Sequence, residues 1–223
     1  MNGKLFTRAI LRFFAGLLIV CLLLFLPAGS LQYHQAWLLI GILFVPMLVA
    51  GLILMKINPE LLEKRLSIKE KEAEQREVVL FSGLMFLAAF ILAGLSKRFG
   101  WLMLPFPVSI IAAAVFLAAY ALYAEVLREN AYLSRTIEVQ EDQKVIDSGV
   151  YGIVRHPMYM ATVILFLAMP LVLGSVISFI VMLSYLPIIV KRIRNEEKVL
   201  TEGLQGYKEY KEKVRYRLIP FIW

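Results

Sequence analysis

The chain has 223 residues, of which 60% are hydrophobic and 18% charged, with a formal net charge of +7. Its apolar residues fall in long charge-free runs rather than being dispersed, so the composition predicts an integral membrane protein without a separate soluble domain. Cys21 is the only cysteine, which excludes a disulfide framework or a cysteine metal site within one chain. In a membrane protein, positive charge is typical of topology and of contact with anionic lipid headgroups, so no nucleic-acid partner is expected.

Cutting the apolar runs at charges and turn residues predicts an all-α fold with about six transmembrane helices. The predicted spans cover residues 10–26, 36–55, 78–95, 102–127, 157–173 and 175–193. The last two meet at Gly174 and are expected to form a tight helical hairpin. Pro46, Pro170 and Pro187 lie within or near span ends, where we expect them to kink helices.

The distribution of basic residues predicts the orientation. With six spans, both termini share one side of the membrane with the connections between spans two and three and between spans four and five. That side holds all of the 24 Lys and Arg residues except Lys97 and Arg98. The positive-inside rule therefore predicts a multi-pass protein with cytoplasmic N- and C-termini.

Two connections have patterns of their own. Residues 56–77 alternate charged and apolar side chains, which predicts an amphipathic helix on the cytoplasmic membrane surface. Residues 136–140 alternate like a short strand, and residues 141–143 are expected to turn it back into residues 144–146.

Polar chemistry is concentrated directly before the fifth span. Residues 149–159 combine a glycine turn, two tyrosines, Arg155, His156 and Pro157. Polar and charged groups at the mouth of a membrane helix are energetically unfavourable unless they bind something. This segment is therefore the candidate active site.

A second polar set follows the sixth span. Arg192, Glu196, Gly203, Tyr207 and Tyr210 recur at helical spacings, so a continuous helix would place them on one stripe. Taken alone, this pattern favours an interfacial helix with an internal Arg192–Glu196 ion pair. The expected hairpin, however, brings this stripe beside residues 151–159 at one membrane surface.

Together the two segments suit a zwitterionic, nucleotide-like ligand. Arginine or histidine can bind a carboxylate, glutamate can accept from ribose hydroxyls, and tyrosines can stack on a base or face a sulfonium cation. No metal site is expected, because His34 lies in a predicted external loop and leaves His156 without a histidine partner.

These motifs resemble the isoprenylcysteine carboxyl methyltransferases and their broad prokaryotic relatives, which also look related to phospholipid N-methyltransferases. The resemblance rests on Gly149-x-Tyr151, Arg155-His156-Pro157-Met158-Tyr159, Glu196-Glu197-x-x-Leu200, Tyr207-x-x-Tyr210 and Arg217-Leu218-Ile219-Pro220. It covers the C-terminal half, whereas the N-terminal spans carry almost no family signature. We therefore divide the chain into N-terminal transmembrane helices, residues 1–127, and a methyltransferase-like cofactor-binding region, residues 128–223.

The resemblance implies S-adenosylmethionine as methyl donor, bound in a cytoplasmic pocket roofed by the C-terminal segment. The candidate cofactor-binding residues are Gln143, Val145, Ile146, Tyr151, Arg155, His156, Pro157, Tyr159, Glu196, Glu197, Tyr207 and Tyr210. In that family an arginine one turn before the glutamate contacts the substrate. Arg192 fits best and Arg194 is the alternative, with Glu196 as a further candidate catalytic residue.

The implied reaction is methyl transfer to a lipid-like acceptor, expected to be the carboxylate of an isoprenylcysteine-type small molecule or protein that enters from the bilayer. A carboxylate is already nucleophilic, so the enzyme needs alignment and a cation such as Arg192 to hold it. An amine acceptor would need proton removal, with which Glu196, Glu197 or a tyrosine would assist.

Two other functions stay open at this point. The C-terminal halves of membrane sterol reductases look similar around Arg155–Tyr159, which makes an NADPH-dependent lipid or sterol-type reductase the first alternative. The second is a non-enzymatic lipid-binding protein that keeps the fold. The acceptor and the oligomeric state are not specified by the sequence.

Overall fold

The structure, a computed structural model, describes residues 3–66, 73–130, 132–133 and 139–223, and these are helical with connecting loops, as predicted. The elements in chain order are α1 (Gly3–Ala28), α2 (His34–Ile57), α3 (Pro59–Leu66), α4 (Ala73–Phe99), α5 (Phe106–Glu129), the 3₁₀ helix η1 (Gly149–Gly152), α6 (Pro157–Val172), α7 (Val176–Met182), α8 (Tyr185–Gly203) and α9 (Tyr207–Lys213).

The predicted spans are found as helices, with changes near the C-terminal end. Among the described residues, five helical segments are long and apolar enough to cross a membrane: Lys4–Ala28, His34–Ile57, Glu77–Phe99, Phe106–Glu129 and Val176–Gly203. The fifth predicted span, α6, is a shorter apolar helix of 16 residues. The sixth was predicted to end at residue 193; instead it bends at Ser184 and its helix continues to Gly203.

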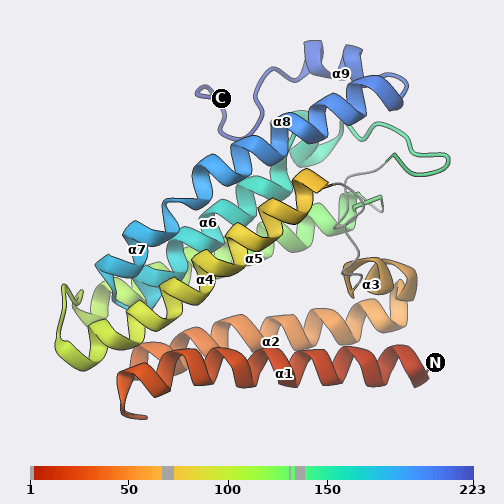
Figure 1. Cartoon of the computed structure of the whole chain (residues 1–223). Helices are drawn as coiled ribbons and strands as arrows, with labels where there is room; N and C mark the ends of the chain where they lie inside the picture. Colours follow the sequence, from red (N-terminus) through yellow and green to blue (C-terminus); the bar gives the residue numbers. More distant parts are fainter. Residues whose placement is uncertain (1–2, 67–72, 131, 134–138) are drawn as a thin grey trace.

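The helices form two layers (Figure 1). The hairpin of α1 and α2 lies along one side of a bundle made by α4 to α8. Gly94 permits a close approach between the layers, because a Cβ there would lie 2.6 Å from the carbonyl oxygen of Leu24. Figure 1 shows the N-terminus, α3, the end of α5 and α9 at the same end of the molecule. This arrangement fits an even number of crossings, and the side of the membrane that this end faces stays a prediction.

The tight hairpin predicted at Gly174 is confirmed. Gly174 has φ +71, which favours glycine, and its carbonyl accepts a 2.8 Å hydrogen bond from the Leu104 amide. The Tyr33 hydroxyl donates to the Leu173 carbonyl at 2.7 Å, and the Ser175 hydroxyl donates to that of Ser96 at 3.0 Å. These bonds fix the turn, so α6 begins and α8 ends at the same end of the bundle.

The loops agree with their predictions only in part. The predicted strand at residues 136–140 lies mostly outside the described residues. The predicted turn at residues 141–143 is present, with Asp142 at φ +54 and a 3.2 Å bond from the Gln143 amide to the Gln140 carbonyl, and residues 144–146 continue as irregular loop. Of the predicted amphipathic helix at residues 56–77, the structure describes α3 and the start of α4. The continuous helix predicted from Arg192 to Tyr210 is wrong, because α8 ends at Gly203 and Gly206, at φ +84, turns the chain into α9.

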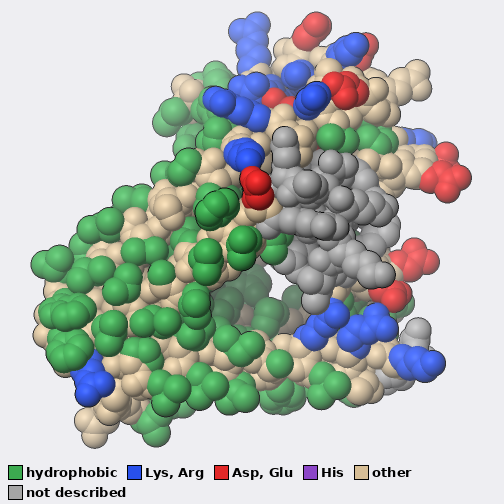
Figure 2. All heavy atoms as spheres, viewed as in Figure 1, with side chains coloured by type: hydrophobic (Ala, Val, Ile, Leu, Met, Phe, Trp, Pro, Cys, Tyr) green, Lys and Arg blue, Asp and Glu red, His purple; other side chains and the backbone are tan. Residues whose placement is uncertain are grey.

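Hydrophobic side chains cover most of the face shown in Figure 2, along the length of the bundle and the α1–α2 hairpin. Basic and acidic side chains gather over the upper part of α8 and α9 and near the N-terminal end. This division between an apolar band and a charged end is the surface expected of a multi-pass membrane protein.

Candidate active site

The loop before α6 is fixed by glycine and by the end of α5. Gly149 has φ +51, which favours glycine, and a Cβ at this position would lie 1.6 Å from Glu129 Oε1 and would displace that carboxylate. The other oxygen of Glu129 accepts a 3.2 Å bond from the Val150 amide. His156 then precedes α6, which begins with Pro157, a residue well suited to the first helical position.

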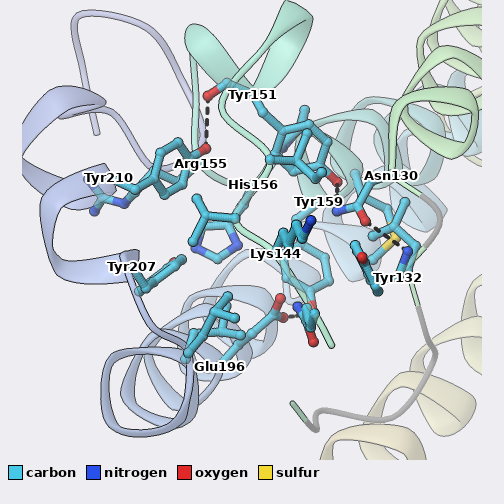
Figure 3. A pocket seen from close by; sticks show the side chains of 18 of the residues that line it. Asn130, Tyr132, Lys144, Tyr151, Arg155, His156, Tyr159, Glu196, Tyr207 and Tyr210 are labelled. Atoms are coloured by element: carbon cyan, nitrogen blue, oxygen red, sulfur yellow. Dashed lines mark hydrogen bonds between the residues drawn. The ribbon is translucent and has the colours of Figure 1, made fainter. Parts of the chain in front are cut away.

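A polar pocket lies where this loop meets α8, α9 and the turn after α5 (Figure 3). It holds a cavity of about 90 Å³, lined by Asn130, Tyr132, Leu133, Gln143, Lys144, Val145, Ile146, Tyr151, Arg155, His156, Pro157, Met158, Tyr159, Arg192, Glu196, Leu200, Leu204, Tyr207 and Tyr210. Two segments far apart in the sequence, residues 151–159 and 192–210, therefore meet as expected.

Most of the predicted site residues line this pocket, including Arg192, Glu196 and both tyrosines of α9. Two predicted site residues, Arg194 and Glu197, do not line the pocket. Arg194 is exposed on the face of α8 opposite Arg192, because positions two residues apart on an α-helix are rotated by about 200° about its axis. Glu197 is buried behind the pocket wall and does not line the cavity, so Glu196 is the glutamate of the pair that does.

Several lining residues were not predicted: Asn130, Tyr132, Leu133, Lys144, Met158, Leu200 and Leu204. Lys144 lies between the predicted residues Gln143 and Val145, and Met158 and Leu200 lie inside quoted motifs. Asn130 and Tyr132 carry no sequence signal, because only the tertiary fold brings the end of α5 to the pocket.

Tyr159 links the two charged residues of α8 that line the pocket. Its hydroxyl donates to Glu196 Oε2, and the Nε of Arg192 donates to that hydroxyl at 3.0 Å. The guanidinium carbon of Arg192 also lies 5.9 Å from the centroid of the Tyr159 ring. Tyr159 is buried, so this link holds Arg192 against the pocket wall.

Glu197 is the centre of a buried ionic cluster. Its Oε1 accepts from Arg155 Nε at 2.8 Å and lies 3.4 Å from His156 Nε2, while its Oε2 accepts from Arg217 Nε at 2.8 Å. A carboxylate between two guanidinium groups is ionised and can only accept, so the Nε2 of His156 carries a proton.

The same cluster fastens the C-terminal segment to the loop. The side chain of Arg155 donates to the carbonyls of Val214 at 2.6 Å and of Arg215 at 3.0 Å. The amides of Arg155 and His156 each donate at 2.9 Å, to the carbonyls of Tyr216 and Arg217. Residues 214–217 therefore pack directly on the segment that carries His156.

The tyrosines of α9 close the pocket. The Tyr210 hydroxyl donates to the Tyr151 carbonyl at 2.8 Å, and the Asn130 amide donates to the Tyr151 hydroxyl at 3.0 Å. The Tyr207 hydroxyl is buried and finds no hydrogen-bond partner among the described residues. Burial raises the pKa of Tyr207, and the nearby Glu197 carboxylate raises it further, so this phenol stays neutral.

A second, open cavity of about 410 Å³ lies between α4, α5, α6 and α8. Its walls are mostly apolar: Val78, Val79, Ser82, Gly83, Phe86, Tyr123, Met158, Tyr159, Thr162, Phe166, Tyr185, Ile189 and Arg192. It shares Met158, Tyr159 and Arg192 with the polar pocket. One wall thus separates a polar pocket at the end of the bundle from an apolar cavity within it.

Known proteins similar to this chain fall within the classes that the motifs resemble. Residues 108–202 match the model of the Isoprenylcysteine carboxyl methyltransferase (ICMT) family. The fold is similar to that of the eukaryotic intramembrane Ras methyltransferase ICMT, with a TM-score of 0.58 over 96% of this chain and 77% of that one, at 20% identity.

The Delta(14)-sterol reductase TM7SF2 of Mus musculus is 31% identical over 91 residues. That match covers 40% of this chain and 22% of the mouse protein, so it spans about a fifth of the length of this relative.

The fold and the pocket define a multi-pass helical membrane protein with a polar site at one end of its bundle. The family match contains α6, nearly all of α8, and the motifs from Gly149 to Tyr159 and at Glu196-Glu197. Residues 108–202, somewhat less than half of the chain, are thus similar to the isoprenylcysteine carboxyl methyltransferase family, the family that the motifs resemble.

Proposed function

We propose that the protein is an S-adenosylmethionine-dependent methyltransferase that methylates the carboxylate of a lipid-like acceptor, such as an isoprenylcysteine. The observation that carries this proposal is the wall shared by the two cavities. The polar pocket suits the donor, the apolar cavity suits a lipid chain, and Tyr159 and Arg192 stand where the two meet. The match of residues 108–202 to the methyltransferase family model supports the same reaction class.

The side chains of the polar pocket fit a zwitterionic nucleoside. A buried hydroxyl without a partner is unfavourable by about 1–3 kcal/mol, and a polar ligand would satisfy that of Tyr207. His156, Tyr151 and Glu196 supply further hydrogen-bonding groups around it. The cavity of about 90 Å³ is smaller than the roughly 300 Å³ at the low end for ligand pockets, so exposed rim residues such as Lys144 must turn aside for binding.

Arg192 is the residue that positions the acceptor. Its planar guanidinium can bind a carboxylate at two points without neutralising it by proton transfer, and its Nε is already oriented by Tyr159. The mostly apolar walls of the second cavity would reduce the hydration of a bound carboxylate and so leave it more reactive. The bound donor would supply an electrophilic methyl group on its sulfonium, so a carboxylate acceptor requires no general base.

The identity to the mouse sterol reductase is the observation behind a second candidate, an NADPH-dependent reductase. We rank it below methyl transfer because the methyltransferase family model matches residues 108–202, which include the loop before α6 and both Arg192 and Glu196.

A thermal-unfolding experiment separates the candidates. The purified protein is heated with S-adenosylhomocysteine, with NADPH and with neither, and a ligand that binds the folded state raises the transition temperature. We expect only S-adenosylhomocysteine to do so, and His156→Ala and Glu196→Ala each to reduce the shift. Stabilisation by NADPH alone would favour the reductase, and no shift with either ligand would contradict both.

Incorporation of labelled methyl groups then tests the acceptor. We expect transfer to a lipid-linked carboxylic acid and not to the same lipid with its carboxylate blocked as an amide.

A further inference from the structure

The helix α8 has two polar faces, and the site uses only one of them. Arg192 and Glu196 lie on the inner face, toward the pocket. Lys191, Arg194 and Lys198 are exposed and recur at spacings of three and four, which places them on one stripe of the opposite face. We name these three residues the outer basic face.

The outer basic face borders an open depression of about 580 Å³. Its described lining is Pro187, Val190, Lys191, Arg194, Asn195 and Lys198, with no carboxylate among them. Lys191 Nζ lies 3.2 Å from Glu77 Oε2, and neither Arg194 nor Lys198 has an acidic partner within the part of the chain that the structure describes. Among the described residues, the depression therefore carries a net positive charge that no neighbouring carboxylate balances apart from Glu77 beside Lys191.

Its position is at the edge of the apolar band. Pro187 and Val190 continue the depression toward the bundle, one turn before the basic residues. In Figure 2, Lys and Arg side chains gather over the upper part of α8 directly beside the hydrophobic surface. This is the level at which lipid phosphates meet acyl chains.

We propose that the outer basic face binds the phosphate group of an anionic phospholipid, with an acyl chain lying against Pro187 and Val190. The fixed fork of a guanidinium suits phosphate, so Arg194 is the central contact, and Lys198 adds a second positive charge one turn further on. A zwitterionic lipid would bring its own cation against the same residues, which disfavours it. The proposal does not depend on the proposed methyl transfer.

The test compares two double variants that lose the same charge. Arg194→Gln with Lys198→Gln removes the proposed contacts. Lys208→Gln with Arg215→Gln removes two exposed cations that do not line the depression. The full-length protein is delipidated in neutral detergent, and binding of phosphatidylglycerol and phosphatidylcholine is titrated by native mass spectrometry.

We expect wild-type protein and the Lys208/Arg215 variant to bind phosphatidylglycerol alike, and both to bind it more tightly than phosphatidylcholine. The Arg194/Lys198 variant should bind phosphatidylglycerol about 25-fold more weakly, which corresponds to about 1 kcal/mol for each cation. Unfolding temperatures in neutral detergent should be equal for all three proteins, since the substituted side chains are exposed.

Three outcomes would overturn the proposal. Equal affinity for the two lipids would show that the charge of the face is irrelevant. An equal loss of phosphatidylglycerol affinity in both double variants would show that binding depends only on the net charge of the protein. Undiminished phosphatidylglycerol binding by the Arg194/Lys198 variant would place the lipid elsewhere.

Discussion

Arg192 is held by Tyr159 in two ways: its Nε donates to the phenol oxygen at 3.0 Å, and its guanidinium carbon lies 5.9 Å from the ring centroid. The same phenol donates to Glu196, so the tyrosine sets the position of the arginine relative to the carboxylate. The proposed positioning of the acceptor therefore depends on the contacts of Tyr159 with Arg192 and Glu196, in the wall between the two cavities.

Tyr159→Phe should keep the aromatic wall and lose the hydroxyl that orients Arg192. We expect turnover in the methyl-incorporation assay to fall about tenfold, the effect of losing roughly 1.4 kcal/mol of positioning, with little change in S-adenosylhomocysteine affinity. Tyr120→Phe is the control, since the Tyr120 hydroxyl lies 3.4 Å from the Leu43 carbonyl and outside both cavities. Similar turnover in the two variants would contradict the role of Tyr159.

Arg192→Lys keeps the charge and loses the two-point geometry. We expect it to reduce turnover by at least about tenfold and to leave donor affinity nearly unchanged. The matched variant Arg194→Lys changes the same residue type on the opposite face of α8 and should behave as wild type. An effect of Arg194→Lys as large as that of Arg192→Lys would remove Arg192 from the proposed role.

Glu197→Ala should destabilise the fold, because it leaves buried Arg155 without its counter-ion. Breaking one side of a buried pair is unfavourable by about 3–5 kcal/mol, which lowers the unfolding temperature by roughly 10 °C in a chain of this size. Glu202→Ala, a substitution of an exposed glutamate on the same helix, should leave the unfolding temperature within about 2 °C of the wild-type value. Thermal unfolding of the ligand-free proteins is the measurement, and equal transitions would refute the structural role of the cluster.

Tyr207→Phe should affect stability and binding in opposite directions. The ligand-free protein should be as stable as wild type or more so, because a buried hydroxyl without a partner is removed. S-adenosylhomocysteine should bind about tenfold more weakly by calorimetry, since the ligand loses a hydrogen bond. Tyr210→Phe, which breaks the 2.8 Å bond to the Tyr151 carbonyl, should instead destabilise the ligand-free protein by about 1 kcal/mol. Unchanged affinity in Tyr207→Phe would show that this hydroxyl does not contact the ligand.

The alkaline limit of stability tests the burial of the two phenols. Burial raises the pKa of Tyr207 and Tyr210 above the ordinary value of about 10. Both phenols hold their protons more tightly in the folded protein than in the unfolded chain. Their contribution to the free energy of unfolding is therefore complete below about pH 10 and is lost as the pH rises further. Unfolding titrations between about pH 9 and 12 should therefore show a shallower loss of stability in the Tyr207→Phe/Tyr210→Phe double variant. An unaltered slope would contradict their burial.

Hydrophobicity and charge were enough to predict the helical spans and the hairpin at Gly174, because length and apolar runs determine membrane spans. The motif around His156 and Tyr159 also located the pocket. The choice between Glu196 and Glu197 was not predictable, since neighbouring helical residues lie about 100° apart and the C-terminal segment decides which one it covers. The outward placement of Arg194, by contrast, followed from its spacing to Arg192 once the helix was known to continue.

The turn at Gly206 shows a different limit. The spacing of Tyr207 and Tyr210 suited one long helix, yet these residues reach the pocket because α8 stops and the chain folds back. Contacts of this kind depend on the tertiary arrangement and leave no periodicity in the sequence. Asn130 likewise lines the pocket without any sequence pattern that predicts it, and its side-chain amide donates to the Tyr151 hydroxyl.

Because the two cavities share a wall, a molecule bound in one cavity directly affects binding in the other. Met158, Tyr159 and Arg192 face both spaces, so any displacement of these side chains by one substrate alters the surface offered to the second. The affinities for donor and acceptor are then thermodynamically linked, and linkage is reciprocal: the factor by which a bound donor analogue changes acceptor affinity equals the factor in the reverse order.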